Sequence, residues 1–252
     1  GMQAKYGVSR IFDTGIRETT IIGQGIGLAL RGFRPIAEIQ YLDYLIYAQS
    51  TLSDDLASMQ YRTLGKQAAP LIIRTRGHQL QGIWHAGSPM QLILGSLRGI
   101  YLCVPRNMTQ AAGFYNTLLE ANDPALVIEP LKGYSQKEPL PSNIGEYRVP
   151  LGVPEIVQQG TDITAVTYGW NVHHVLKAAH LLKEIKNISV EVIDVQTLMP
   201  FDVNHLILES VKRTNKVIFI FYFVPGGGTA YMMQKVLQEQ QVFNYLDTAP
   251  RT

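Results

Sequence analysis

The chain has 252 residues, of which 46% are hydrophobic and 17% charged. This composition is typical of a globular protein and excludes a disordered chain. The formal net charge is +2 and the basic residues form no long run, so nucleic acid and anionic membranes are not indicated as partners. No apolar stretch approaches the roughly 20 residues of a membrane span. Residues 1–5 lack the apolar segment of a signal peptide, so we expect a cytoplasmic protein, with Gly1 preceding a natural start at Met2.

The sequence contains one cysteine, Cys103, inside the apolar run at 100–104. A single cysteine excludes a disulfide framework and fits a reducing compartment. We expect a buried thiol on a strand rather than a catalytic nucleophile.

Short β-branched or aliphatic runs alternate with helical patterns along the first half. This alternation predicts a parallel sheet flanked by helices. In chain order, we expect a helix at 19–31, a strand at 35–40, a helix at 44–58, a strand at 71–75, a helix at 88–95, a strand at 101–105, a helix at 108–121 and a strand at 125–129.

The segment 131–150 is rich in proline and charge, with little periodicity, and we interpret it as a connector. A second α/β pattern follows it. We expect strands at 163–168, 190–194 and 216–222, helices at 172–186 and 203–213, and a last helix from the glycines at 226–228 to about 240. The fold class is therefore α/β, with two domains whose sheets are mostly parallel and flanked by helices.

Two glycine clusters could bind phosphate. The cluster at 23–27 lacks the preceding strand that a dinucleotide-binding fingerprint requires, so we expect close helix packing instead. The cluster at 226–228 lies between a strand and a helix, where an anion could bind. A tight turn also explains this cluster and is the favoured interpretation.

Among the titratable residues, Glu18 and His85 stand out. Glu18 begins a predicted helix, where the macrodipole alone favours a carboxylate. His85 lies in a loop before a Ser-Pro helix start and could be catalytic. His173 and His174 point to different faces of one predicted helix, and His180 does not complete a metal site with them. Signatures of zinc sites and of serine nucleophiles are absent from the sequence.

Five collinear blocks carry a more specific signal. Together they resemble the β subunits of thiamine-diphosphate-dependent 2-oxo acid dehydrogenases over nearly the whole chain. RIFDTGIRE at 10–18 resembles RVFDTPI-x-E, GFRPIAEIQYLDY at 32–44 resembles G-x-RPV-x-EIQFADY, HAGSP at 85–89 resembles HSQSP, NDPALVIEP at 122–130 resembles NP-x-IF-x-EP, and VIDVQTLMPFD at 192–202 resembles EVIDLRTI-x-P-x-D.

The resemblance implies a transketolase-like pyrimidine-binding domain at 2–130, a linker at 131–150 and a transketolase C-terminal-like domain at 151–252. In this family, thiamine diphosphate binds between two subunits, with its pyrimidine on the β subunit. The diphosphate and Mg²⁺ lie on the α subunit, at a GDG…N motif that this sequence lacks. The expected partners are therefore an α subunit, a second β subunit in a heterotetramer and a lipoyl-bearing acyltransferase.

The resemblance also assigns roles to particular residues. Glu18 matches the glutamate that hydrogen-bonds N1′ of the cofactor and favours the tautomer that deprotonates C2. Tyr41 and Tyr44 match aromatic positions near the aminopyrimidine, and Gln40 is a polar neighbour. His85 matches the histidine that transfers a proton or orients groups when the acyl group passes to lipoyl. The pattern at 38–44 favours the branched-chain (2-oxoisovalerate) type over the pyruvate or acetoin type.

The sequence departs from the family at several positions. It lacks an N-terminal GEDV…GG block and a longer C-terminus, and residues 222–225 replace a HEAP-like stretch. Gly87 and its preceding alanine replace two polar residues of HSQSP. Ile72 replaces the threonine of the K⁺ loop, so K⁺ binding would depend on backbone carbonyls. A truncated or degenerate paralogue that only assembles with a partner is the alternative to an active 3-methyl-2-oxobutanoate dehydrogenase subunit.

Overall fold

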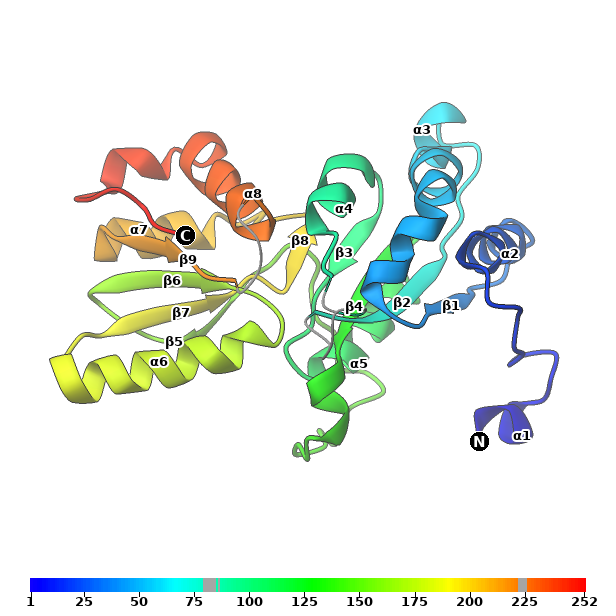
Figure 1. Cartoon of the computed structure of the whole chain (residues 1–252), viewed down its shortest axis with the longest axis horizontal. Helices are drawn as coiled ribbons and strands as arrows, with labels where there is room; N and C mark the ends of the chain where they lie inside the picture. The colour runs from blue at the N-terminus through cyan, green and yellow to red at the C-terminus, as the bar shows by residue number, and fades with distance from the viewer. Residues whose placement is uncertain (79–84, 86, 222–225) are drawn as a thin grey trace.

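The computed structural model describes residues 1–78, 85, 87–221 and 226–252. Two sheets lie side by side, each flanked by helices (Figure 1). This is the two-domain α/β fold with mostly parallel sheets that the sequence predicts.

The first sheet has five strands in the order β1-β2-β4-β3-β8. They are β1 (Ile36–Ile39), β2 (Ile72–Gly77), β3 (Tyr101–Cys103), β4 (Ala125–Pro130) and β8 (Thr197–Met199). The strands β1, β2, β4 and β3 run parallel to one another, and β8 pairs with β3 in the antiparallel direction. Every residue of β4 is buried, as expected for a central parallel strand that is covered on both faces.

Helical segments cover both faces of this sheet. They are α2 (Glu18–Leu30), the 3₁₀ helix η1 (Leu42–Ala48), the π-helix η2 (Thr51–Ala57), α3 (Met59–Arg62), α4 (Met90–Ser96) and α5 (Met108–Leu118), after a short N-terminal α1 (Met2–Tyr6). Apolar residues of α2, η1, η2 and α4 share one core, whereas α5 packs in a separate cluster with β3 and β4. The single helix expected at 44–58 is thus two helical segments of different pitch.

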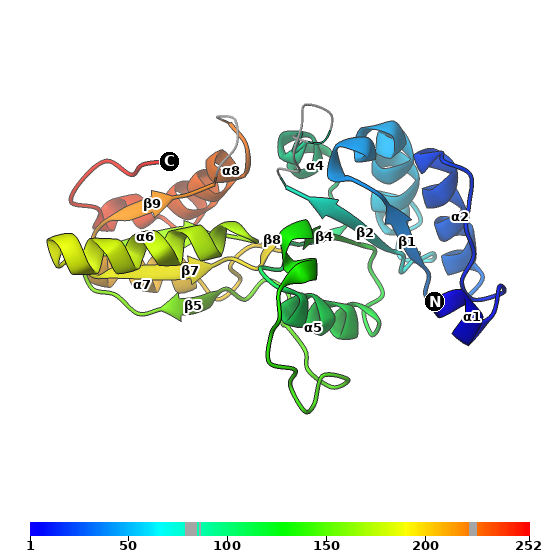
Figure 2. The same cartoon turned by 60° about the horizontal axis from the view of Figure 1, so that its bottom comes forward.

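The second sheet has four strands in the order β5-β7-β6-β9. They are β5 (Glu155–Gln158), β6 (Ile163–Thr167), β7 (Val190–Asp194) and β9 (Val217–Phe219). The helical segments of this half are α6 (Asn171–Lys186), α7 (Leu206–Thr214), α8 (Gly228–Gln234), η4 (Lys235–Glu239) and η5 (Val242–Tyr245), and η3 (Leu131–Ser135) lies in the connector. Figure 2 shows α6 running along this sheet. The core that contains α6 is separate from the one that contains α7 and α8.

The helix expected at 203–213 begins later, at Leu206. The Asp202 carboxylate accepts hydrogen bonds from the backbone N–H groups of Leu206 (2.7 Å) and Ile207 (3.0 Å). A carboxylate that binds the free N–H groups of a first turn defines where a helix starts. The Asp202 carboxylate therefore stabilises the first turn of α7 and fixes its start at Leu206.

The two halves are joined by β8 and by a buried ion pair. Arg106, after β3, places Nη1 2.8 Å from Asp194 Oδ2 at the end of β7 and 2.8 Å from Glu155 Oε2. Asp194 is fully buried, and burial raises the pKa of its carboxyl group while Arg106 opposes that rise. The Gln110 amide also donates to Asp194, over 3.3 Å. Asp194 is thus shielded from solvent at this junction, whereas the side chain of Glu155 stays 46% exposed.

Among the described residues, no helix is both long and apolar enough to cross a membrane.

The glycines of α2 have different surroundings. A Cβ added at Gly25 would lie 2.7 Å from Leu71 Cδ1, whereas one added at Gly23 or Gly27 would meet nothing within 4 Å. Leu71 is fully buried, so its side chain has little room to move. The predicted close packing of this cluster is therefore confirmed at Gly25 alone among these three.

We predict that Gly25→Ala lowers the free energy of unfolding by about 1–3 kcal/mol, because the new methyl group overpacks the core at Leu71. Gly23→Ala is the matched control on the same helix. It should raise stability by about 0.5–1 kcal/mol, since alanine favours a helix interior. Urea unfolding measures both changes, and equal effects of the two substitutions would contradict the packing described here.

Candidate functional site

The residues predicted to bind the cofactor gather where β1 and β2 end. Gln40, Tyr41 and Tyr44 follow β1, His85 lies in the chain after β2, and Glu18 is the first residue of α2. Thr19 Oγ1 donates to the Tyr47 carbonyl over 2.7 Å, which ties the start of α2 to η1. The carboxyl ends of parallel strands are where α/β proteins bind ligands.

The His85 imidazole is surrounded by aromatic rings and one carboxylate. It stacks on Tyr41, with ring centroids 4.0 Å apart and planes at 24°, and it lies edge-on to Tyr44 at 5.2 Å. Asp43 Oδ2 lies 3.4 Å from His85 Nδ1. Family resemblance assigns His85 and the two tyrosines to one cofactor site but gives Asp43 no role.

Arg76 fixes the segment after β1 from the neighbouring strand. Its Nε donates to the Gln40 carbonyl over 2.9 Å, and its guanidinium carbon lies 5.1 Å from the Tyr41 ring centroid. Its Nη2 is 3.7 Å from Glu38 Oε1. A cation over a tyrosine ring is a stabilising contact. Arg76 therefore stabilises the position of Tyr41, on which His85 stacks. The Gln40 residue itself is exposed.

Glu18 is 8% exposed, and no described residue forms a hydrogen bond or ion pair with its carboxylate. Partial burial raises the pKa of Tyr44, and the charges of Asp43 and, to a smaller extent, Glu18 add to that rise. Glu18 is therefore close enough to Tyr44 for its charge to act there. A largely buried glutamate without a partner among the described residues is the feature expected of a group that binds a ligand nitrogen.

His78 is a residue of this region that sequence reasoning missed. Its Nδ1 lies 2.5 Å from Ser88 Oγ, just before α4. Its ring lies 4.9 Å from that of Phe221 and 6.1 Å from that of Tyr168, both in the second half. His78 and Ser88 flank His85 in the sequence and contact each other, so the chain that carries His85 is anchored on both sides. The second domain contacts the His78 side, through Tyr168 and Phe221. The available signal was a histidine three residues after the end of the strand predicted at 71–75.

The remaining histidine predictions and the cysteine lie elsewhere. His173 Nε2 is 3.1 Å from the Arg106 carbonyl oxygen, and its ring is 4.5 Å from that of Trp170. Cys103 is a buried free thiol whose pKa is raised by burial, which confirms the structural interpretation. No described group of three or more His, Cys, Asp or Glu side chains is arranged to hold a metal.

The structure describes some of the positions at which the sequence departs from the family. Ile72 is buried inside β2, between Ile36 and Ala125 on the adjacent strands, and its side chain offers no ligand to K⁺. Gly228 begins α8 against the Tyr168 hydroxyl, where a Cβ would clash, so close packing accounts for this glycine. Residues 222–225 and Ala86 lie outside the described residues.

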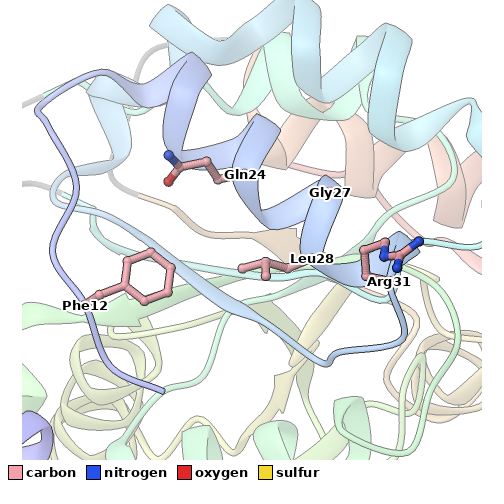
Figure 3. Close-up of a pocket in the computed structure, with 5 residues that line it drawn as sticks. All are labelled: Phe12, Gln24, Gly27, Leu28 and Arg31. Carbon is pink, nitrogen blue, oxygen red and sulfur yellow. The ribbon is translucent and has the colours of Figure 1, made fainter. Parts of the chain in front are cut away.

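A shallow groove of about 390 Å³ lies on the outer face of α2. Figure 3 shows Phe12, from the segment before the helix, facing Leu28, with Gln24 and Arg31 on either side along the helix. Gly27 completes the lining. The groove has neither a carboxylate nor an imidazole, so it carries none of the chemistry found near Glu18.

Comparisons with known proteins agree with this architecture. The family described as the transketolase pyrimidine binding domain matches residues 1–136, and the transketolase C-terminal domain matches residues 152–252. A solved structure described as a split gene transketolase, inactive beta4 tetramer, has a TM-score of 0.76 at 22% identity and covers 99% of this chain and 76% of that one. The predicted transketolase-like fold is therefore confirmed.

Two curated relatives show what the chain resembles in sequence. The pyruvate dehydrogenase E1 component subunit beta of Acholeplasma laidlawii is 34% identical, over 99% of this chain and 76% of that protein. The mitochondrial 2-oxoisovalerate dehydrogenase subunit beta of Dictyostelium discoideum is 35% identical, over 95% of this chain and 65% of that protein. Since both substrate types occur at nearly equal identity, similarity does not separate them.

We predict that acid destabilises the protein through His78. Burial lowers the pKa of His78 to about 3, whereas an unfolded histidine titrates near pH 6.5. Between these values the unfolded chain binds a proton that the folded chain does not, so stability falls as pH falls. The loss from this residue should approach about 1.4 kcal/mol per pH unit below pH 6.

Urea unfolding at pH 7 and pH 5 measures this dependence. His78→Gln should flatten it, while His180→Gln, an exposed control on α6, should retain the wild-type slope. An unchanged slope in His78→Gln would show that the imidazole is not buried in its neutral form.

Proposed function

Because the chain belongs to the family of 2-oxo acid dehydrogenase β subunits built from transketolase pyrimidine-binding and C-terminal domains, we propose that it supplies the pyrimidine half of a thiamine diphosphate site. An α subunit supplies the other half and holds the diphosphate and Mg²⁺. The pyrimidine-binding domain spans residues 2–130, the linker 131–150 and the C-terminal domain 151–252.

The Glu18 carboxylate is the observation that carries this proposal. It is almost fully buried, has no bonding partner among the described residues and lies near the Tyr44 ring. These properties fit a group that holds a proton on a ring nitrogen of an aromatic ligand. Bound thiamine diphosphate supplies a carbon nucleophile that adds to the carbonyl of a 2-oxo acid. Glu18 hydrogen-bonds the N1′ position and thereby keeps the cofactor reactive.

The other residues of the cluster orient the cofactor or the His85 ring, and His85 itself transfers a proton. Tyr44 and Gln40 line the pyrimidine position. Tyr41 stacks on His85 and fixes the plane of its imidazole. His85 gives or takes a proton at Nε2 when the acyl group is transferred to lipoyl, which is chemistry suited to an imidazole near neutral pH. The partners are thus an α subunit, a second copy of this chain and a lipoyl-bearing acyltransferase.

The second candidate function is a non-catalytic assembly partner. The loss of the family's HEAP-like stretch at residues 222–225 favours it. The two functions differ in one measurable property, since both require assembly with an α subunit but the second gives no cofactor-dependent decarboxylation.

We predict that Glu18→Gln abolishes decarboxylation by the complex of this chain with its α subunit. The reason is that an amide cannot exchange the N1′ proton, and lost general acid–base catalysis costs about 10²–10⁴-fold in rate. Glu184→Gln, on the exposed face of α6, removes one carboxylate elsewhere and should keep the wild-type rate. The rate is followed as CO₂ release with thiamine diphosphate and Mg²⁺ present. Full activity in Glu18→Gln would refute the role given to Glu18.

We predict a branched-chain substrate, from the pattern at residues 38–44. The reconstituted complex should show a kcat/KM for 2-oxoisovalerate at least tenfold above that for pyruvate, since 2-oxoisovalerate has two more methyl groups and each such carbon in an apolar pocket contributes about 1–3 kcal/mol. Steady-state rates with both substrates decide the question. A preference for pyruvate would assign the chain to the pyruvate or acetoin type.

A further inference from the structure

Asp43 faces a buried nitrogen of His85. The Nδ1 atom is shielded from solvent and forms no hydrogen bond with any described residue, although Asp43 Oδ2 is 3.4 Å away. The contact is an ion-pair distance without hydrogen-bond alignment. Such contacts around catalytic groups are commonly long before substrate binds and tighten afterwards. A modest rotation of either side chain would form the bond.

The surroundings leave Asp43 available for this contact. Among the described residues, His85 is the single basic side chain within ion-pair distance of Asp43. The Asp43 side chain is 20% exposed and that of His85 25% exposed. An interaction between partly buried groups is screened less by solvent and salt than one on the surface.

The glycine after His85 permits the approach. A Cβ added at Gly87 would lie 3.2 Å from Asp43 Cβ, which is tighter than ordinary contact. Gly87 therefore lets its backbone lie against Asp43 without displacing the Asp43 side chain.

We propose that Asp43 is a positioning residue that accepts a hydrogen bond from His85 Nδ1–H, so that the proton stays on Nδ1 and the lone pair is on Nε2. The tautomer of a neutral imidazole is set by the hydrogen bond that its other nitrogen makes. Stacking on Tyr41 fixes the ring plane, and Asp43 fixes which nitrogen carries the proton. Nε2 is then the atom that accepts a proton. What Nε2 acts on rests on the proposed function, whereas the tautomer does not.

The tautomer is measured on the chain itself, by ¹⁵N NMR of the histidine side chains at a pH where imidazoles are neutral. The His85 signals are assigned by their loss in His85→Gln. We expect the Nδ1–H form to dominate in the wild type and the Nε2–H form to dominate in Asp43→Ala. Asp55→Ala, an exposed control on η2, should leave the wild-type tautomer. An Nε2–H form in the wild type, or no change in Asp43→Ala, would overturn the proposal.

Two further measurements distinguish the positioning role of Asp43 from a loss of folding and from a failure of the proposed function. Asp43→Asn keeps the shape and an accepting oxygen, so it should retain more of the Nδ1–H form than Asp43→Ala. In the complex with an α subunit, Asp43→Ala should slow acylation of a lipoyl domain by about tenfold or more, with decarboxylation to a dye acceptor less affected. A wild-type rate of lipoyl acylation in Asp43→Ala would overturn the positioning role. Absence of any thiamine-dependent activity in the wild-type complex would refute the proposed function while the tautomer result still stood.

Discussion

The buried contact between Arg106 and Asp194 joins the two halves of the molecule, and the candidate site depends on that junction. Asp194 ends a strand of the second sheet and is completely buried, so its charge requires the guanidinium that the first half provides. Beside this pair, β8 leaves the second half and extends the first sheet. A buried charge that lost its partner would be strongly destabilising. This ion pair and the apolar core that the two halves share, which includes Leu102 and Val166, together set the relative placement of the domains.

The second domain contacts the candidate site through aromatic rings. Tyr168 and Phe221, at the ends of strands in the second half, stack with centroids 4.3 Å apart, and the His78 ring lies against both. His78 in turn contacts Ser88, and the chain between these two residues carries His85. The second domain thus supports a catalytic candidate that belongs to the first. Glu18, by contrast, is positioned within the first domain by α2 and η1.

Features of the fold that depend on the local pattern of apolar and polar residues can be predicted from the sequence. The alternation of apolar runs and amphipathic segments gives most strands and helices, and the position of Cys103 in an apolar run gives its burial. The strands β5 and β8 were not expected, because no residue of β5 is fully buried and β8 is a three-residue strand that joins the sheet of the other half. For the site, family resemblance selects Glu18, Tyr41, Tyr44 and His85. The stacking on Tyr41 and the approach of Asp43 arise from tertiary geometry, which no local pattern encodes.

The central claim is that this chain holds half of a thiamine diphosphate site. Calorimetric titration of the cofactor, with Mg²⁺ present, into the chain alone and into its complex with an α subunit tests that claim most directly. We expect saturable binding by the complex that Glu18→Gln weakens, and no comparable binding by the chain alone. Equally tight binding by the isolated chain, or none by the complex, would contradict it.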